Sequence, residues 1–229
     1  MKNPIFTLSG RLGDTILALP IFSWYYKTHG GKAIVVLANF AYVEGMIDLL
    51  NIQECVEKAI LSTYTPRYYR IGGQPYHWNP FKYGLNIEEA PYYNLGYKSK
   101  TDKYAPEFFA EEYGFGVDYD FTLNYGPVDN TYKEQIVKVD RWKTPWLDKV
   151  NAVALTDKNS MIKNLQYAAG AKEVLTVPTG FSILMALARL PMTFYQTKRR
   201  GEDWYMTRCF KISGPIKRIF VDGEYPTHE

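Results

Sequence analysis

A 229-residue chain that is 46% hydrophobic and 22% charged has the composition of a packed globular protein, long enough for one large or two small domains. Its net charge of +3 is too small to indicate nucleic-acid binding by itself. Its two cysteines lie outside any CxxC or Cys/His cluster, which argues against a zinc site and favours reduced thiols. The longest apolar run, residues 181–188, is far shorter than the roughly 20 residues that span a bilayer, so we expect a soluble, cytoplasmic protein without a transmembrane segment.

Residues 4–60 alternate between predicted strands and helices. Apolar residues within 16–25 have the spacing of a helix with one broad apolar face, which stops near residues 29–31. The continuous apolar run 33–38 is typical of a strand buried on both faces of a parallel sheet. The other elements expected here are strands at 5–8 and 55–61 and a helix at 42–50. This β-α-β-α-β order predicts a parallel sheet with right-handed crossovers.

Residues 62–104 interrupt the alternation with a stretch dominated by tyrosine, proline and glycine. A long loop-like insert in a compact domain is usually functional or mobile. Its aromatic and basic side chains suit stacking on sugars or on nucleic-acid bases. The candidate acceptor-binding residues are Arg67, Arg70, Tyr76, His77 and Trp78. A self-packed tyrosine-rich loop is the open alternative.

The remainder of the chain returns to an α/β pattern. A helix is expected over 106–113, because Pro106 suits the first turn of a helix and Gly114 follows its end. Further strands are expected at 135–139, 173–177, 192–195 and 218–221, and helices at 159–169 and 181–190. No internal repeat or low-complexity tract is present.

The turn after the first predicted strand carries Arg11, Gly13 and Asp14. Ligands of open α/β sheets bind at the carboxyl ends of the strands. A carboxylate at Asp14 could accept the proton of an attacking hydroxyl group as a general base, and Arg11 could offer charge to a phosphate. Aspartate is also a preferred helix N-cap, so a purely structural role for Asp14 stays open.

A second turn, Thr179-Gly180-Phe181-Ser182, follows a predicted strand and opens an apolar helix. The N-terminus of a helix presents free N–H groups and the positive end of the helix dipole, both of which favour phosphate. Glycine permits close approach of the backbone, and the threonine hydroxyl adds a donor. A tight turn capped by Thr179 is the alternative.

Together, the two turns resemble the heptosyltransferases, glycosyltransferase family 9. Gly-Arg-Leu-Gly-Asp-Thr-Ile-Leu-Ala-Leu-Pro at 10–20 looks like their N-terminal signature, and residues 172–195 resemble their donor-site segment. The passage 115–121 is similar to their interdomain approach. The family's usual Asp and His are replaced by Pro178 and Ile183, which leaves the identity of the donor open.

The resemblance implies an α/β fold of the GT-B type, with two Rossmann-like parallel-sheet domains and an active site in the cleft between them. It places an acceptor domain at 1–130, with the aromatic insert 62–104, and a reduced donor domain at 131–229. It implies inverting transfer from a nucleotide sugar to a saccharide or lipopolysaccharide-type hydroxyl, without metal or cofactor. Asp14 falls on the catalytic base, and Thr179, Gly180, Phe181, Ser182, Arg11 and Gly13 fall on or near the donor site. Arg141 and Lys143 are candidates for the family's phosphate-binding lysine.

Three other interpretations remain. Asp118-Tyr119-Asp120 is a DxD sequence, the motif that holds a divalent metal in GT-A glycosyltransferases. An aromatic acceptor loop would also suit a viral-type glycosyltransferase that acts on a hydroxylated base in DNA. The altered donor turn would suit a catalytically degenerate protein that only binds nucleotide sugars. A nicotinamide dehydrogenase is disfavoured, because residues 10–14 lack the three-glycine fingerprint.

Overall fold

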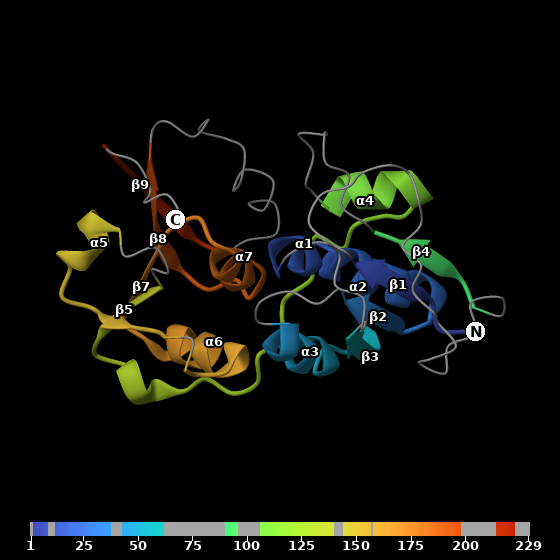
Figure 1. Cartoon of the computed structure of the whole chain (residues 1–229), viewed down its shortest axis with the longest axis horizontal. Coiled ribbons are helices and arrows are strands. Elements are labelled where there is room, and N and C mark those ends of the chain that lie inside the picture. The colour runs from blue at the N-terminus through green and yellow to red at the C-terminus, as the bar shows by residue number, and fades with distance from the viewer. Residues whose placement is uncertain are drawn as a thin grey trace. The chain divides into compact units, whose positions relative to one another are not determined.

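The chain forms two compact units, Met1–Phe121 and Thr122–Glu229, each built on a parallel β-sheet (Figure 1). The computed structural model describes residues 2–8, 12–37, 43–61, 90–95, 106–139, 144–156, 158–197 and 214–222. Two parallel sheets with intervening helices confirm the predicted α/β fold with two Rossmann-like units. The acceptor and donor roles given to residues 1–130 and 131–229 stay predictions. In the described ranges, no helix is long and apolar enough to cross a bilayer.

The sheet of the first unit has the strand order β3-β2-β1-β4, with every neighbouring pair parallel. Its strands are β1 (Ile5–Leu8), β2 (Ala33–Leu37), β3 (Val56–Leu61) and β4 (Tyr92–Asn94). The first three were predicted. The fourth lies within the aromatic insert and was not, because three residues are too few to show a strand periodicity.

The first helical segment differs from the prediction, since it consists of two helices. These are α1 (Leu12–Leu17) and α2 (Leu19–His29), separated by Ala18. Pro20 stands in the first turn of α2, where its missing N–H and fixed φ are tolerated and where it cannot continue a preceding helix. The end of α2 is as predicted: Gly30 adopts φ 75° and donates its N–H to the carbonyl of Tyr26.

The first unit is completed by α3 (Val43–Asn51) and α4 (Pro106–Tyr113), both close to their predicted bounds. An aromatic cluster fills its core. The ring of Phe6 on β1 lies 4.6 Å from that of Phe22 on α2 and 5.2 Å from that of Tyr93 on β4. Phe115 joins through Tyr93, at 4.7 Å. These contacts recruit β4 and residues after α4 to the sheet, so tertiary packing supplies what the local sequence lacks.

The sheet of the second unit has the order β6-β5-β7-β8-β9, again all parallel. Its strands are β5 (Ile136–Val139), β6 (Val153–Ala154), β7 (Glu173–Thr176), β8 (Met192–Thr197) and β9 (Ile216–Val221). Its helical segments are the 3₁₀ turn η2 (Asn130–Tyr132), α5 (Pro145–Asp148), α6 (Met161–Gly170) and α7 (Gly180–Leu187). The two-residue β6 and four-residue α5 were not predicted. Residues 182–187 of α7 are all buried, as expected for a helix that is apolar on every side.

Candidate functional site

The strand order of each sheet contains one topological switch point. In the first unit the chain leaves β1 toward β2 and β3, and later adds β4 on the other side of β1. In the second unit β6 and β7 lie on opposite sides of β5. In open α/β sheets ligands bind outside the carboxyl ends of the strands at such a point. The segment after β1 and the turn after β7 therefore each occupy the expected binding position of their own sheet.

The segment after β1 leads directly into α1, which includes Gly13 and Asp14. Because α1 begins at Leu12, Asp14 belongs to its first turn rather than to the capping position before it. An acidic residue in the first turn also interacts favourably with the helix dipole. Arg11 and the side chain of Asp14 lie outside the described residues, so their predicted roles as charge donor and base stay predictions.

The turn after β7 is a reciprocal capping box at the start of α7. The Ser182 N–H donates to Thr179 Oγ1 at 3.3 Å, and the Thr179 N–H donates to Ser182 Oγ at 3.2 Å. The Ser182 hydroxyl also donates to the Thr179 carbonyl at 2.7 Å, and the residue is 0% exposed. Ser182 thus shapes the turn from inside the protein, whereas the Thr179 hydroxyl keeps its own proton to donate.

Two backbone donors at this turn stay available for a ligand. Across the described ranges, neither the Gly180 N–H nor the Phe181 N–H has a hydrogen-bond acceptor. The first N–H groups of a helix have no intrahelical partner, and the dipole places positive potential beside them. The N–H groups of Gly180 and Phe181 and the Thr179 hydroxyl therefore lie together as hydrogen-bond donors at the carboxyl end of β7, where donors of this kind favour an anion.

Thr176 is a residue of this site that the sequence did not single out. It ends β7, is 0% exposed, and its hydroxyl lies 3.4 Å from the carbonyl of Val139, the last residue of β5. It therefore links the two strands that flank the switch point. A threonine that directly follows the buried Val174 and Leu175 in β7 was the only available signal.

Lys138 on neighbouring β5 is engaged elsewhere and is not among the donors at the start of α7. Its ammonium donates to the carbonyl of Leu147 at 3.0 Å and lies 3.4 Å from Asp148 Oδ1, which ties β5 to α5. The candidates Arg141 and Lys143 follow β5 but lie outside the described residues, as do Arg67, Arg70, Tyr76, His77 and Trp78.

No family model and no curated protein matches the sequence. Solved structures do. The E. coli heptosyltransferase WaaC with ADP matches at 14% identity and a TM-score of 0.56, over 95% of this chain and 93% of that one. A glycosyl transferase family 9 protein from Veillonella parvula DSM 2008 matches at 10% identity and a TM-score of 0.62, over 96% and 86%. The dodecameric iron-containing heptosyltransferase TibC from enterotoxigenic E. coli, in complex with ADP-D-beta-D-heptose, matches at 12% identity and a TM-score of 0.57, over 97% and 64%.

The chain has the fold of these glycosyltransferases. The resemblance predicted from two short motifs is thereby confirmed for the fold. At 10–15% identity the match concerns the path of the backbone and not the ligand.

Within this heptosyltransferase-like fold, Asp118 of the DxD sequence has a structural role. Its carboxylate accepts a hydrogen bond from Ser23 Oγ at 2.5 Å and pairs with Lys27 Nζ at 2.6 Å, and its side chain is 8% exposed. Burial would raise the pKa of Asp118, but the hydrogen bonds from Lys27 and Ser23 outweigh it, so the pKa is lowered. The side chain of Asp120, by contrast, is exposed, and the backbone N–H of Asp120 donates a hydrogen bond to Asp118 Oδ1. Among the described residues, no group of three or more His, Cys, Asp or Glu could hold a metal ion. The local geometry therefore favours a link between α2 and the segment after α4 over a GT-A metal site.

We predict that Asp118→Asn lowers the free energy of unfolding by about 1.5 to 3 kcal/mol at pH 7, the usual contribution of hydrogen bonds to a charged group. Because the folded pKa lies below the unfolded value, this stabilisation is present above the unfolded pKa and is lost as pH falls through the folded one. Urea denaturation at pH 7, 5 and 3 should show the variant converging on the wild type in acid. Asp120→Asn is the matched control, and an equal loss in that variant would contradict the role given to Asp118.

Proposed function

We propose that the chain is a glycosyltransferase that transfers a sugar from a nucleotide-diphosphate sugar to an acceptor hydroxyl group, with inversion and without a metal. The observation that carries the proposal is the set of hydrogen-bond donors at the start of α7, which lies at the switch point of its sheet. The fold of the chain matches glycosyltransferases whose structures hold ADP or ADP-D-beta-D-heptose. The fold supports glycosyl transfer in general, and the donors of the turn support binding of an anionic group such as the donor diphosphate.

The donor diphosphate would accept hydrogen bonds from the N–H groups of Gly180 and Phe181 and from the Thr179 hydroxyl. Negative charge grows on the diphosphate as its bond to the sugar breaks, and donors already fixed in place stabilise that charge without rearrangement. The buried Ser182 hydroxyl holds these donors in position. TibC is described as iron-containing, so metal independence is a part of the proposal that needs its own test.

Asp14 would act as the general base. In that step the acceptor oxygen forms a bond to the anomeric carbon, the bond from that carbon to the diphosphate breaks with its electron pair, and the acceptor proton moves to the Asp14 carboxylate. A single displacement of this kind inverts the anomeric centre. The position of Asp14 in the first turn of α1, beside the switch point of its sheet, is consistent with this role.

The acceptor is proposed to be a saccharide bound through the aromatic insert, with a hydroxylated base in DNA as the alternative. Binding to DNA would weaken steeply with salt, because phosphate contacts release counterions, whereas a neutral saccharide would bind independently of salt. A second alternative follows from Ile183, which is 1% exposed where the family often has histidine. A buried aliphatic side chain offers no polar contact to a donor, as expected of a protein that binds nucleotide sugars without turnover.

Thermal unfolding in the presence of ADP-, UDP-, GDP-, CDP- and dTDP-sugars tests the donor site. A ligand at 100 times its dissociation constant should stabilise the protein by about 2.7 kcal/mol, and EDTA should leave the shift unchanged. Gly180→Glu should abolish the shift through charge repulsion, while Gly180→Gln, of the same size, should weaken it less. Absence of a shift with every nucleotide sugar, or equal loss in the two variants, would contradict the proposed donor turn.

A further inference from the structure

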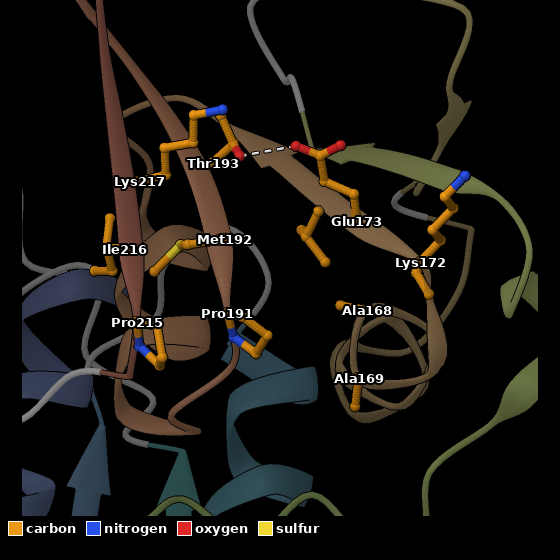
Figure 2. A pocket seen from close by; sticks show the side chains of 12 residues that line it. Ala168, Ala169, Lys172, Glu173, Pro191, Met192, Thr193, Pro215, Ile216 and Lys217 are labelled. Carbon is orange, nitrogen blue, oxygen red and sulfur yellow. Dashed lines mark hydrogen bonds between the residues drawn. The ribbon is translucent and has the colours of Figure 1, made fainter.

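Figure 2 shows a groove of the second unit, whose volume is about 410 Å³. It lies at the amino ends of the strands, whereas the donor turn follows the carboxyl end of β7. It is formed by the last turn of α6 and by the first residues of β7, β8 and β9, which are the amino ends of these strands. Its volume falls within the range of pockets that hold small organic molecules. No residue of the proposed glycosyltransferase site lines the groove. The proposed reaction therefore does not account for it.

The polar residues of the groove come from one face of the sheet. Thr193 on β8 is in register with Lys217 on β9 and with Leu175 on β7, so these side chains share a face with Glu173, two residues before Leu175. The Thr193 hydroxyl donates to Glu173 Oε1 at 2.9 Å. Figure 2 shows Glu173, Thr193 and Lys217 gathered at one end, with Lys172 pointing the same way.

The apolar residues come from the opposite face and from the strand starts. Met192 is in register with Ile216, and both point away from the polar row (Figure 2). Pro191 and Pro215 directly precede these residues and are exposed, and Ala168 contributes the surface of α6. The groove therefore lies across the amino ends of the strands, with apolar side chains on one side of the sheet and polar side chains on the other. A small amphipathic molecule that spans these strand ends can contact both sides.

The charge of the polar side favours an anion. Lys172 and Lys217 are both exposed, and neither ammonium forms an ion pair with a residue that the structure describes. Glu173 supplies one opposing charge, but its carboxylate already accepts the Thr193 hydroxyl. Lys172 also follows the C-terminus of α6, where a positive charge interacts favourably with the helix dipole. This interaction accounts for Lys172 without any ligand. Lys217 lies on β9 and has no such interaction with a helix, so a substitution of Lys217 is the clearer test of anion binding.

A strained turn directly precedes Pro191, which lines the groove. Arg189 has φ 55°, the single positive φ outside glycine among the described residues. Its N–H donates to the carbonyl of Ala186 and the Leu190 N–H donates to that of Met185, both at 3.0 Å. This is the hydrogen-bond pattern of a Schellman motif, whose left-handed residue is usually glycine. Backbone strain of this kind persists only where the surroundings enforce it, and it often accompanies function.

The start of β9 packs on that turn. A Cβ atom at Gly214 would lie 2.3 Å from the carbonyl oxygen of Arg189, so only glycine permits this approach. The Met192 N–H donates to the Pro215 carbonyl at 3.1 Å and joins the two strand starts. Pro191 and Pro215 are therefore held in position before any ligand arrives, which reduces the ordering entropy that binding would require.

We propose that this groove binds a small organic monocarboxylate with an aliphatic body, its chain against Met192 and Ile216 and its carboxylate near Lys217. The aliphatic chain buries apolar surface, and the lysines select the sign of the head group. The site is separate from the donor turn, so it adds a second ligand to the protein rather than a substrate of the proposed reaction.

Octanoate is the probe, titrated into unliganded protein that carries ¹³C-methyl methionine. The Met192 methyl signal, assigned through Met192→Leu, should move saturably, while that of Met46 in the other unit should not. Lys217→Gln should weaken octanoate about two- to five-fold, the effect of one exposed charge, and Lys149→Gln, of equal charge change but outside the groove, should not.

A second test compares the binding of octylamine with that of octanoate to the unaltered protein, so it does not depend on the folding of any variant. Octylamine should bind more weakly than octanoate, because it reverses the sign of the head group. Equal or tighter binding of octylamine, no saturable movement of Met192, or equal weakening by Lys149→Gln would overturn the proposal. Binding of a peptide with a free C-terminal leucine in place of octanoate would overturn it as well. No nucleotide sugar is present in these experiments, so their failure would leave the proposed donor turn unaffected.

Discussion

Replacement of Asp14 by asparagine is expected to lower the rate of sugar transfer by about 10²- to 10⁴-fold, the usual contribution of a general base. Asparagine has nearly the same shape as aspartate but cannot accept the proton of the acceptor hydroxyl. Binding of the nucleotide sugar should be nearly unchanged, because the donor contacts are assigned to Gly180, Phe181 and Thr179. The rate is measured as release of nucleoside diphosphate, with the sugar that stabilises the protein and a panel of saccharide acceptors.

Asp48→Asn is the matched control for this prediction. Asp48 is an exposed acid on α3 of the same unit, so it reports the effect of removing one negative charge without removing the proposed base. Thermal unfolding with and without the nucleotide sugar measures donor binding separately from the rate of sugar transfer. An unchanged transfer rate in Asp14→Asn would exclude Asp14 as the base. Loss of the thermal stabilisation by the nucleotide sugar in this variant would instead indicate that Asp14 contributes to donor binding.

Local sequence signals were sufficient for many elements of the fold. The strand β2 was predicted because Ala33–Leu37 is apolar throughout, which only a doubly covered strand tolerates. The bounds of α4 were predicted because Pro106 suits the first turn and Gly114 adopts φ 68° just after the last. In the first case the signal is the burial of apolar side chains, and in the second it is the restricted conformation of proline and the left-handed conformation that glycine tolerates.

Other elements depend on contacts between distant residues. The strand β4 forms because Tyr93 packs on Phe6 and Phe115, and nothing in the local sequence indicates these partners. The break at Ala18 had a local signal in Pro20, but the apolar spacing on both sides favoured one helix. The same signal was present at Pro145, which opens α5 and was not used.

In the candidate site, too, some features follow from local sequence and others depend on contacts between distant residues. The sequence indicated which turns could bind a ligand, and the pairing of strands shows that each turn follows a strand at a switch point. Strand order is non-local, so the turns alone could not establish it. The sequence also placed Ser182 among the donor contacts, whereas its burial and its hydrogen bonds with Thr179 indicate that it positions the turn.

Gly170→Ala is expected to destabilise the protein by about 3 kcal/mol, at the upper end of the usual effect of overpacking. A Cβ atom at this position would lie 2.0 Å from the carbonyl oxygen of Asp129 and 2.7 Å from its carbon, and both are backbone atoms that cannot rotate away. Displacement of Asp129 would also disturb its hydrogen bonds to Thr131, at 2.9 and 2.6 Å, and its pairing with Lys163 at 2.5 Å.

The sign of this effect is decided by the contact rather than by helix propensity. Alanine is favoured over glycine by up to about 1 kcal/mol inside a helix, so the substitution would stabilise α6 if the position were open. Gly30→Ala is the control: Gly30 has φ 75°, and a methyl group added there would meet no atom within 4 Å, so only backbone strain of about 1 to 2 kcal/mol opposes alanine. Urea denaturation of the two variants should place the larger loss at Gly170. A smaller loss there than at Gly30 would mean that η2 can move away from α6, and that the start of the second unit packs less firmly than its hydrogen bonds indicate.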